Sequence, residues 1–210
     1  MTQSKTLRRW ELALLLGVAL AALLGVWLDG AQAALSDRVI RLHVLANSDS
    51  EADQALKLRV RDAVLAEAEE LFVPGAGRAE TEELLRAHLY DLAAAGVEVV
   101  GEAGYSYPVT ASLVHDYWFP TKTYTDFALP AGAYTALRIE IGAGGGQNWW
   151  CVVFPPLCLG SVSETTQETA LEAGLTENQV SLMTGEDEGY VVKFKAVELL
   201  EQFKGWLEGR

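Results

Sequence analysis

Residues 39–64 read VIRLHVLANSDSEADQALKLRVRDAV, and this stretch contains the transition that organises the rest of the chain. Its first part, Val39–Ala46, alternates apolar Ile40, Leu42 and Val44 with polar side chains, which is the pattern of a strand. Four small polar residues follow, and the apolar positions then take helical spacing. The stretch therefore predicts a strand that leads through a tight turn into a long helix.

The turn is rich in residues that cap helices. Asn47–Ser50 supplies four of them in succession, and Ser48 with Glu51 has the spacing of a capping box. A helix is predicted from Glu51 to Phe72. The stripe that should face the core comprises Ala52, Leu56, Val60, Val64 and Leu71.

Helical and extended patterns then follow one another along the chain. A second helix is predicted at residues 80–95, with Gly96 as its C-terminal cap. Strands are predicted at 97–100, 109–119, 124–129, 134–141 and 150–154, the last of them central because it is fully apolar, and a final helix at 195–207. Residues 160–188 are polar and weakly patterned, which predicts a loop-rich segment. We therefore expect residues 36–210 to form a single α+β domain, with helices packed on a mostly antiparallel or mixed sheet.

The N-terminus has the organisation of an export signal. Three basic residues among the first nine precede an uncharged apolar run, Leu12–Leu28, and Ala31-Gln32-Ala33 has the small-x-small form of a signal-peptidase site. We interpret residues 1–33 as a signal peptide, with an uncleaved membrane anchor as the alternative because the run approaches the length of a membrane span. In both cases the basic flank stays in the cytoplasm and the rest of the chain is exported.

The chain carries a formal net charge of −13, which restricts its partners. Nucleic-acid binding is disfavoured because the phosphate backbone is neutralised by Lys and Arg. Peripheral binding to an anionic bilayer is also disfavoured, because the negatively charged protein is repelled by the negatively charged surface. Membrane contact is therefore expected through the N-terminal segment only.

Few residues offer catalytic or metal-binding chemistry. His43, His88 and His115 are scattered without metal-ligand spacing, so neither a metal site nor a cofactor is predicted. The absence of G-x-S-x-G removes the nucleophile elbow of one large class of serine hydrolases. The glycine-rich stretch at 142–146 lacks the Lys-Ser/Thr that completes a phosphate-binding loop.

The two cysteines, Cys151 and Cys158, leave three interpretations open. An oxidising compartment permits a disulfide between them, and Pro155-Pro156 could supply the turn. They could instead be two buried free thiols. The third interpretation is a thiol nucleophile at Cys151 with His43 or His115 as its base, which would make the protein a cysteine-dependent hydrolase of the cell envelope.

Asn148-Trp149-Trp150-Cys151 is the patch with the strongest suggestion of a binding surface. On a strand, Trp149 and Trp150 face opposite sides of the sheet, so one can belong to the core while the other is available to a partner. A wall-binding module that stacks sugar rings on Trp149 and Trp118 is a further alternative.

Three blocks of this sequence resemble the stage II sporulation protein R family of endospore-forming bacteria. The first lies within the stretch quoted above and comprises residues 39–50, 53–54, 57–58 and 60–64. The second comprises YWFPT at 117–121 and LPAGAYTALR at 129–138, and the third is Gly144 with GQNWWCVVFPPLC at 146–158. The resemblance covers residues 39–158 with gaps, and the N-terminal export segment is also similar to that of the family.

The resemblance implies an exported signal protein, not an enzyme. Members are made in the forespore and exported towards the space between the two septal membranes. There they activate a membrane-embedded aspartic protease of the mother cell, which removes the pro-segment of the mother-cell sigma factor. The catalytic aspartates belong to that partner, so no catalytic residue is expected in this chain.

Nothing in the resemblance identifies the contact surface, so we base a hypothesis on the residues themselves. Asn47 and Asp49 follow one predicted strand, and Asn148 and Trp149 begin another. We expect the Asn47–Asp49 turn and the 148–158 segment to lie together and to contact the protease, because loops at strand ends carry function. The alternative is that these residues only cap the first helix and fill the core.

Overall fold

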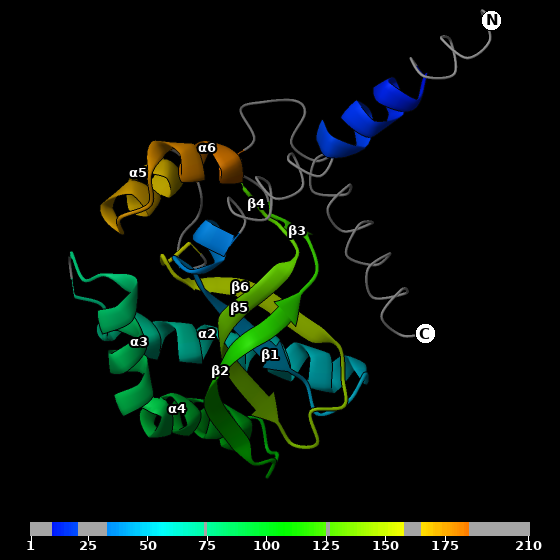
Figure 1. The fold of residues 1–210 in the computed structure, drawn as a ribbon. Coiled ribbons are helices and arrows are strands. Elements are labelled where there is room, and N and C mark those ends of the chain that lie inside the picture. The colour runs from blue at the N-terminus through cyan, green and yellow to red at the C-terminus, as the bar shows by residue number, and fades with distance from the viewer. Residues whose placement is uncertain (1–9, 21–32, 74, 125–126, 158–164, 185–210) are drawn as a thin grey trace, which may run out of the picture. The chain divides into compact units, whose positions relative to one another are not determined.

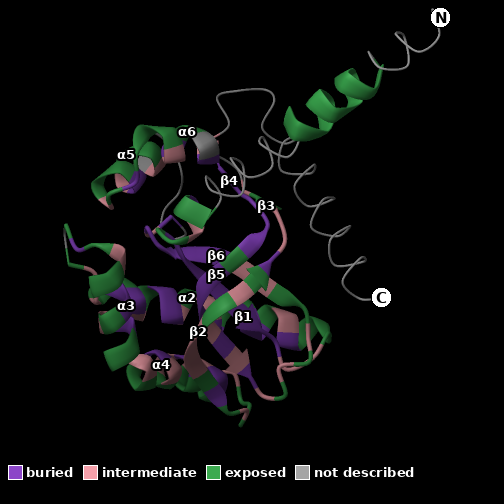
Figure 2. Ribbon diagram, in the orientation of Figure 1, coloured by how far each residue is buried: buried purple, intermediate pink, exposed green. Residues whose placement is uncertain are grey.

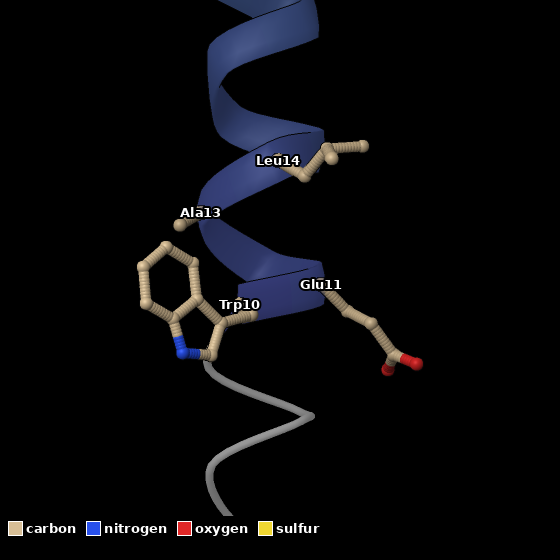
Figure 3. A pocket seen from close by; sticks show the side chains of 4 residues that line it. All are labelled: Trp10, Glu11, Ala13 and Leu14. Atoms are coloured by element: carbon tan, nitrogen blue, oxygen red, sulfur yellow. The ribbon is translucent and has the colours of Figure 1, made fainter.

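The structure is a computed structural model that describes residues 10–20, 33–73, 75–124, 127–157 and 165–184 (Figure 1). The chain divides into two compact units, Met1–Leu35 and Ser36–Arg210. In the first unit, residues 10–20 are helical and exposed throughout. Trp10, Glu11, Ala13 and Leu14 line a pocket on this helix, and the pocket is mostly apolar (Figure 3).

The predicted signal segment, residues 1–33, lies largely outside the described part of the chain. Within the described residues, none of the helices combines the length and the apolar character needed to cross a membrane. Export and cleavage after Ala33 therefore stay predictions.

The second unit is built on a four-stranded sheet in the order β2-β5-β1-β6 (Figure 1). Its strands are β1 (Ile40–Leu45), β2 (Val109–Phe119), β5 (Gly132–Ile141) and β6 (Asn148–Phe154). β1 runs parallel to β5 and antiparallel to β6, while β2 runs antiparallel to β5. The sheet is therefore mixed. All six residues of β1 are buried because this strand lies inside the sheet.

Three helices cover one face of the sheet (Figure 1). They are α2 (Glu51–Glu70), α3 (Arg78–Ala87) and α4 (Leu89–Glu102). Their apolar faces share one core with alternate residues of the strands, as the period of two along a strand requires. This core includes Ile40, Leu42, Val44, Leu56, Val60, Val64, Leu85, Leu92, Leu137, Ile139 and Ile141. The predicted α+β class is confirmed, together with the first helix and its central stripe, although Ala52 at the start of that stripe is exposed.

The prediction for residues 96–100 is wrong. Gly96 is not a C-terminal cap but lies inside α4, and the expected strand after it is helical. A Cβ atom at Gly96 would lie 2.9 Å from Cγ1 of Val109 and 3.2 Å from Cγ1 of Val60. Glycine is therefore what allows α4 to approach both α2 and β2 closely, and this packing overrides the strand propensity of the valines that follow.

Other boundaries also differ from the predictions. β6 lies at an edge of the sheet and is apolar on both faces because both are covered: Val153 faces the helices and Val152 is buried on the opposite side. In place of one strand at 124–129 there is a small hairpin of β3 (Lys122–Thr123) and β4 (Ala128–Leu129). The predicted helix at 195–207 lies outside the described residues.

The loop-rich prediction for residues 160–188 is corrected by two short helices, α5 (Thr165–Glu172) and α6 (Glu177–Thr184). Their sequence pattern is weak because they bury few side chains. Ala170 is buried in α5, Val180 and Met183 in α6, and Leu175 between the two. So few apolar positions do not make a periodic stripe that can be recognised in the sequence.

Candidate functional site

The turn between β1 and α2 is fixed by one carboxylate. Asp53 is buried at the first turn of α2, where it accepts hydrogen bonds from Nδ2 of Asn47 (2.9 Å) and Oγ of Ser48 (2.5 Å). Its own backbone N–H donates to Oγ of Ser50, at 3.1 Å. Ser50 is therefore the N-cap, and the predicted capping box of Ser48 and Glu51 is wrong.

These hydrogen bonds also determine how Asp53 titrates. Those from Ser48 and Asn47 lower the pKa of the Asp53 carboxyl below its ordinary value of 3.8, since both favour the charged form. The stabilisation from this network is therefore present above pH 3.8 and is lost as the pH falls through the lower pKa of the folded state.

The same turn is tied to the loop that precedes β6. Oδ1 of Asn47 accepts from the backbone N–H of Ala143 at 3.0 Å, and Oδ1 of Asp49 accepts from that of Gln147 at 2.7 Å. From α2, Nζ of Lys57 donates to the carbonyl oxygen of Gln147 at 2.8 Å. Burial lowers the pKa of Lys57. We call this surface, formed by residues 47–50 and 142–148, the corner.

The structure brings together the four residues chosen from the sequence, but it gives them different environments. Asn47 is half-buried and uses both amide atoms inside the corner. Asp49 and Asn148 are exposed. Trp149 is half-buried on the helical face, where the guanidinium carbon of Arg61 lies 4.4 Å from the ring centroid. Asn47 and Trp149 thus have structural roles. Asp49 and Asn148 are exposed, although each also accepts one hydrogen bond within the domain. Contact with a partner stays a prediction.

The two tryptophans face opposite sides of β6, as predicted. Trp149 packs against the helical core, whereas Trp150 lies on the other face, with its ring centroid 6.3 Å from that of Phe119. Trp118 belongs to β2, at the other edge of the sheet, and is 50% exposed. Trp118 and Trp149 therefore do not form one platform for stacking sugar rings.

An aromatic layer around Arg41 covers the face of the sheet opposite the helices, and no local sequence pattern predicts it. The fully buried guanidinium carbon of Arg41 lies 4.1 Å from the ring centroid of Phe119 and 5.0 Å from that of Tyr134. Nη2 donates to the hydroxyl of Tyr124 at 3.2 Å, and this hydroxyl donates to the carbonyl oxygen of Trp150 at 3.1 Å. Nε and Nη1 have no hydrogen-bond partner among the described residues. Contact with ring faces is therefore a main stabilisation of this buried charge.

His43 connects the aromatic layer to the corner. Its ring centroid lies 5.0 Å from that of Tyr117 and 6.1 Å from that of Phe119. Its Nε2–H donates to Oδ1 of Asn148 at 2.7 Å. Burial is the main cause of the lowered pKa of His43, because the charged imidazolium would lose its hydration. The one sequence signal for this layer was a pair of basic residues, Arg41 and His43, on a strand with aromatic residues elsewhere in the chain.

The geometry does not support a thiol nucleophile at Cys151. Cys151 faces the helical core, while His43 lies on the opposite face of the neighbouring strand, where it pairs with Trp150. His115 is on β2, three strands away from β6 and thus about 14 Å distant. Neither imidazole can take a proton from this thiol.

No cysteine is free among the described residues. Cys158 lies outside them, so its pairing with Cys151 stays a prediction. The described residues also contain no group of three or more His, Cys, Asp or Glu side chains placed to hold a metal ion. The corner is a surface held together by hydrogen bonds.

Fold and site together define a mixed-sheet α+β domain whose polar residues join the β1–α2 turn to the loop before β6. A family model described as stage II sporulation protein R matches residues 36–164, more than half of the chain, so the chain belongs to this family. The stage II sporulation protein R of Bacillus subtilis (strain 168) is 40% identical over 124 residues. That match covers 59% of this chain and 55% of the relative, so it spans just over half of the relative's length. No solved structure matches.

Gly146 should be intolerant of any side chain. A Cβ atom there would overlap the backbone carbonyl oxygen of Ser48 and lie 2.9 Å from Cβ of Ala46. We expect Gly146→Ala to lower the free energy of unfolding by about 2 kcal/mol, because the corner must open. Chemical denaturation of the purified protein would measure the change.

Gly145→Ala is the matched control, since its Cβ atom would make only an ordinary contact, 3.5 Å from the carbonyl oxygen of Asn47. It should alter the free energy of unfolding by less than about 0.5 kcal/mol. Equal effects at the two positions would mean that the loop does not lie against the turn.

Stability should depend on pH through His43. The folded pKa of His43 is lower than its ordinary value of 6.5, so the unfolded chain binds more protons below pH 6.5. The free energy of unfolding should therefore decrease as the pH falls from 7 to 5, a range above the titration of Asp53. His43→Phe should reduce this dependence while keeping the ring packing.

Denaturation curves at several pH values would test this. His88→Gln is the control, because it removes an imidazole elsewhere and leaves His43 in place. A slope that is the same in His43→Phe and in the unmodified protein would contradict the assignment.

Proposed function

We propose that this chain is an exported sporulation signal protein that activates a membrane-embedded aspartic protease, which then processes the mother-cell pro-sigma factor. Membership of the stage II sporulation protein R family supports a role in sporulation. The site of action in this proposal is the space between forespore and mother cell. The protein reaches it through its N-terminal segment, either cleaved or retained as an anchor.

One observation carries the non-enzymatic part of this proposal. Cys151 and His43, the pair that a cysteine-dependent hydrolase would need, lie on opposite faces of the sheet. The polar residues of the corner are engaged in hydrogen bonds that hold β1, α2 and β6 together. Such an arrangement gives a well-ordered surface on which Asp49 and Asn148 are exposed. A surface of this kind favours binding to a partner protein over catalysis.

An activator of this kind needs only differential binding. If it binds the active arrangement of the protease about 3 kcal/mol more tightly than the inactive one, the equilibrium shifts roughly 150-fold. Within the corner, Asp49 and Asn148 are exposed, and the hydrogen bond to Gln147 uses one carboxylate oxygen of Asp49, which leaves the other to accept from a partner. Charge-assisted hydrogen bonds donated by a partner to such a carboxylate contribute enough to account for much of that difference.

The net charge of −13 also favours a protein partner in this compartment. It keeps the domain from adhering to anionic lipid, so its orientation depends on the N-terminal segment and on the protease. The protease surface that it meets should accordingly carry Lys or Arg.

Reconstitution would test the proposed function. We would co-express the chain with the candidate aspartic protease and the pro-sigma substrate and follow processing by immunoblot. Processing should require this chain and should persist in Cys151→Ser, because no reaction uses the sulfur of this residue. An inactive but folded Cys151→Ser protein would favour the envelope hydrolase instead, and no processing with the unmodified chain would reject the proposal.

Asp49 tests the corner as the contact surface. Asp49→Ala removes one exposed carboxylate and its hydrogen bond to Gln147, so it should lower the free energy of unfolding by no more than about 1 kcal/mol. We expect it to raise the amount of protein needed for half-maximal processing about tenfold.

The matched control is Glu98→Ala, which removes one exposed carboxylate from α4, a helix that is not part of the corner. It should process as the unmodified protein does. Normal processing by folded Asp49→Ala would remove this residue from the contact surface.

A further inference from the structure

The outer edge of β2 is open in the described structure. β2 is the terminal strand of the sheet and pairs only with β5 among the described residues. Between Thr110 and Trp118 its residues are half-exposed or exposed, as the pink and green of this strand in Figure 2 show. An open edge presents unpaired backbone groups that can pair with another extended chain.

The register identifies the groups that face outward. The carbonyl oxygen of Pro108 accepts from the N–H of Gly142 at 2.8 Å, so this is a hydrogen-bonded pair of the antiparallel ladder. Such pairs alternate with non-hydrogen-bonded ones, and Ala111 and Leu113 fall in the latter, opposite Ile139 and Leu137. The N–H and C=O groups of Ala111 and Leu113 therefore point away from β5.

The composition of β2 suits added pairing. Val109–Val114 contains no charged residue and no proline, the usual protections of an edge strand. The ladder is interrupted after Val114, and Asp116 has a φ of 54°, so a regular edge is limited to these six residues. Trp118, 50% exposed beyond the interruption, offers an aromatic anchor beside it.

We propose that β2 binds an extended segment of the protein that this chain activates, so that the segment becomes a fifth strand of the sheet. This inference rests on the proposed function and names the mode of recognition. Backbone pairing with Ala111 and Leu113 gives affinity, and the side chains around Trp118 give selectivity. A second copy of the chain is a poorer occupant, because each copy carries a net charge of −13.

Ala111→Pro tests the edge directly. The substitution removes one outward N–H and places a ring where the added strand would lie, while the ladder to β5 keeps its hydrogen bonds. In the reconstituted system, the amount of full-length chain needed for half-maximal processing should rise at least about tenfold. Circular dichroism and denaturation would establish that the variant folds.

Glu177→Pro is the control for the proline itself. It places the same ring at the first residue of α6, where the N–H has no intrahelical acceptor and proline is well tolerated. This variant should process as the unmodified chain does. Unchanged processing by folded Ala111→Pro would overturn the edge inference while leaving the proposed function intact, whereas no processing with the unmodified chain would reject the function itself.

Amide hydrogen exchange tests the edge without a mutation. In the free protein the amides of Ala111 and Leu113 should exchange rapidly, and those of Ser112 and Val114, which face β5, should be protected. Adding the detergent-solubilised protease should slow exchange at Ala111 and Leu113. No change at these amides despite active processing, or protection that grows with the concentration of the chain alone, would overturn the inference, the latter in favour of a second copy.

Discussion

The rest of the domain depends on the hydrogen bonds that the carboxylate of Asp53 accepts at the start of α2. This carboxylate receives hydrogen bonds from Asn47 and Ser48 and so fixes the angle at which α2 leaves β1. Because β1 is the buried strand between β5 and β6, this angle also sets how α2 lies over the core. The same turn also accepts hydrogen bonds from the loop before β6. One buried carboxylate therefore helps to position the helix over the sheet and to hold the corner.

The elements that the sequence predicted well are those whose information is local. The alternation around Leu42 and the helical spacing of Leu56, Val60 and Val64 are visible without knowledge of the fold, and both were confirmed. The residues of the corner were also recognisable, since capping residues and a glycine-rich stretch stand out. The sequence did not indicate that Asn47 has a structural role whereas Asp49 is exposed. That difference depends on hydrogen bonds between segments almost 100 residues apart in the chain.

The aromatic layer could not be predicted for a different reason. Arg41 and His43 have the composition of a solvated strand face, and only the strand order brings Phe119, Tyr134 and Trp150 over them. Similarly, the strand propensity after Gly96 was overridden by the close approach of α4 to α2 and β2, which no local pattern reports. In both cases the deciding contact is tertiary, whereas sequence patterns describe neighbours along the chain.

The glycine-rich loop at residues 142–146 has a practical consequence for protein engineering. Its composition is that of a flexible linker, and such linkers are the usual places to insert epitope tags, fluorophores or reporter domains. Here the loop is held by backbone hydrogen bonds to Ala46 and Asn47, and it leaves no room for a side chain at Gly146. A tag in this loop would separate β6 from the turn before α2. The exposed residues 104–106 after α4 are a more permissive insertion point, provided that Gly104 itself is kept, because its φ of 81° favours glycine.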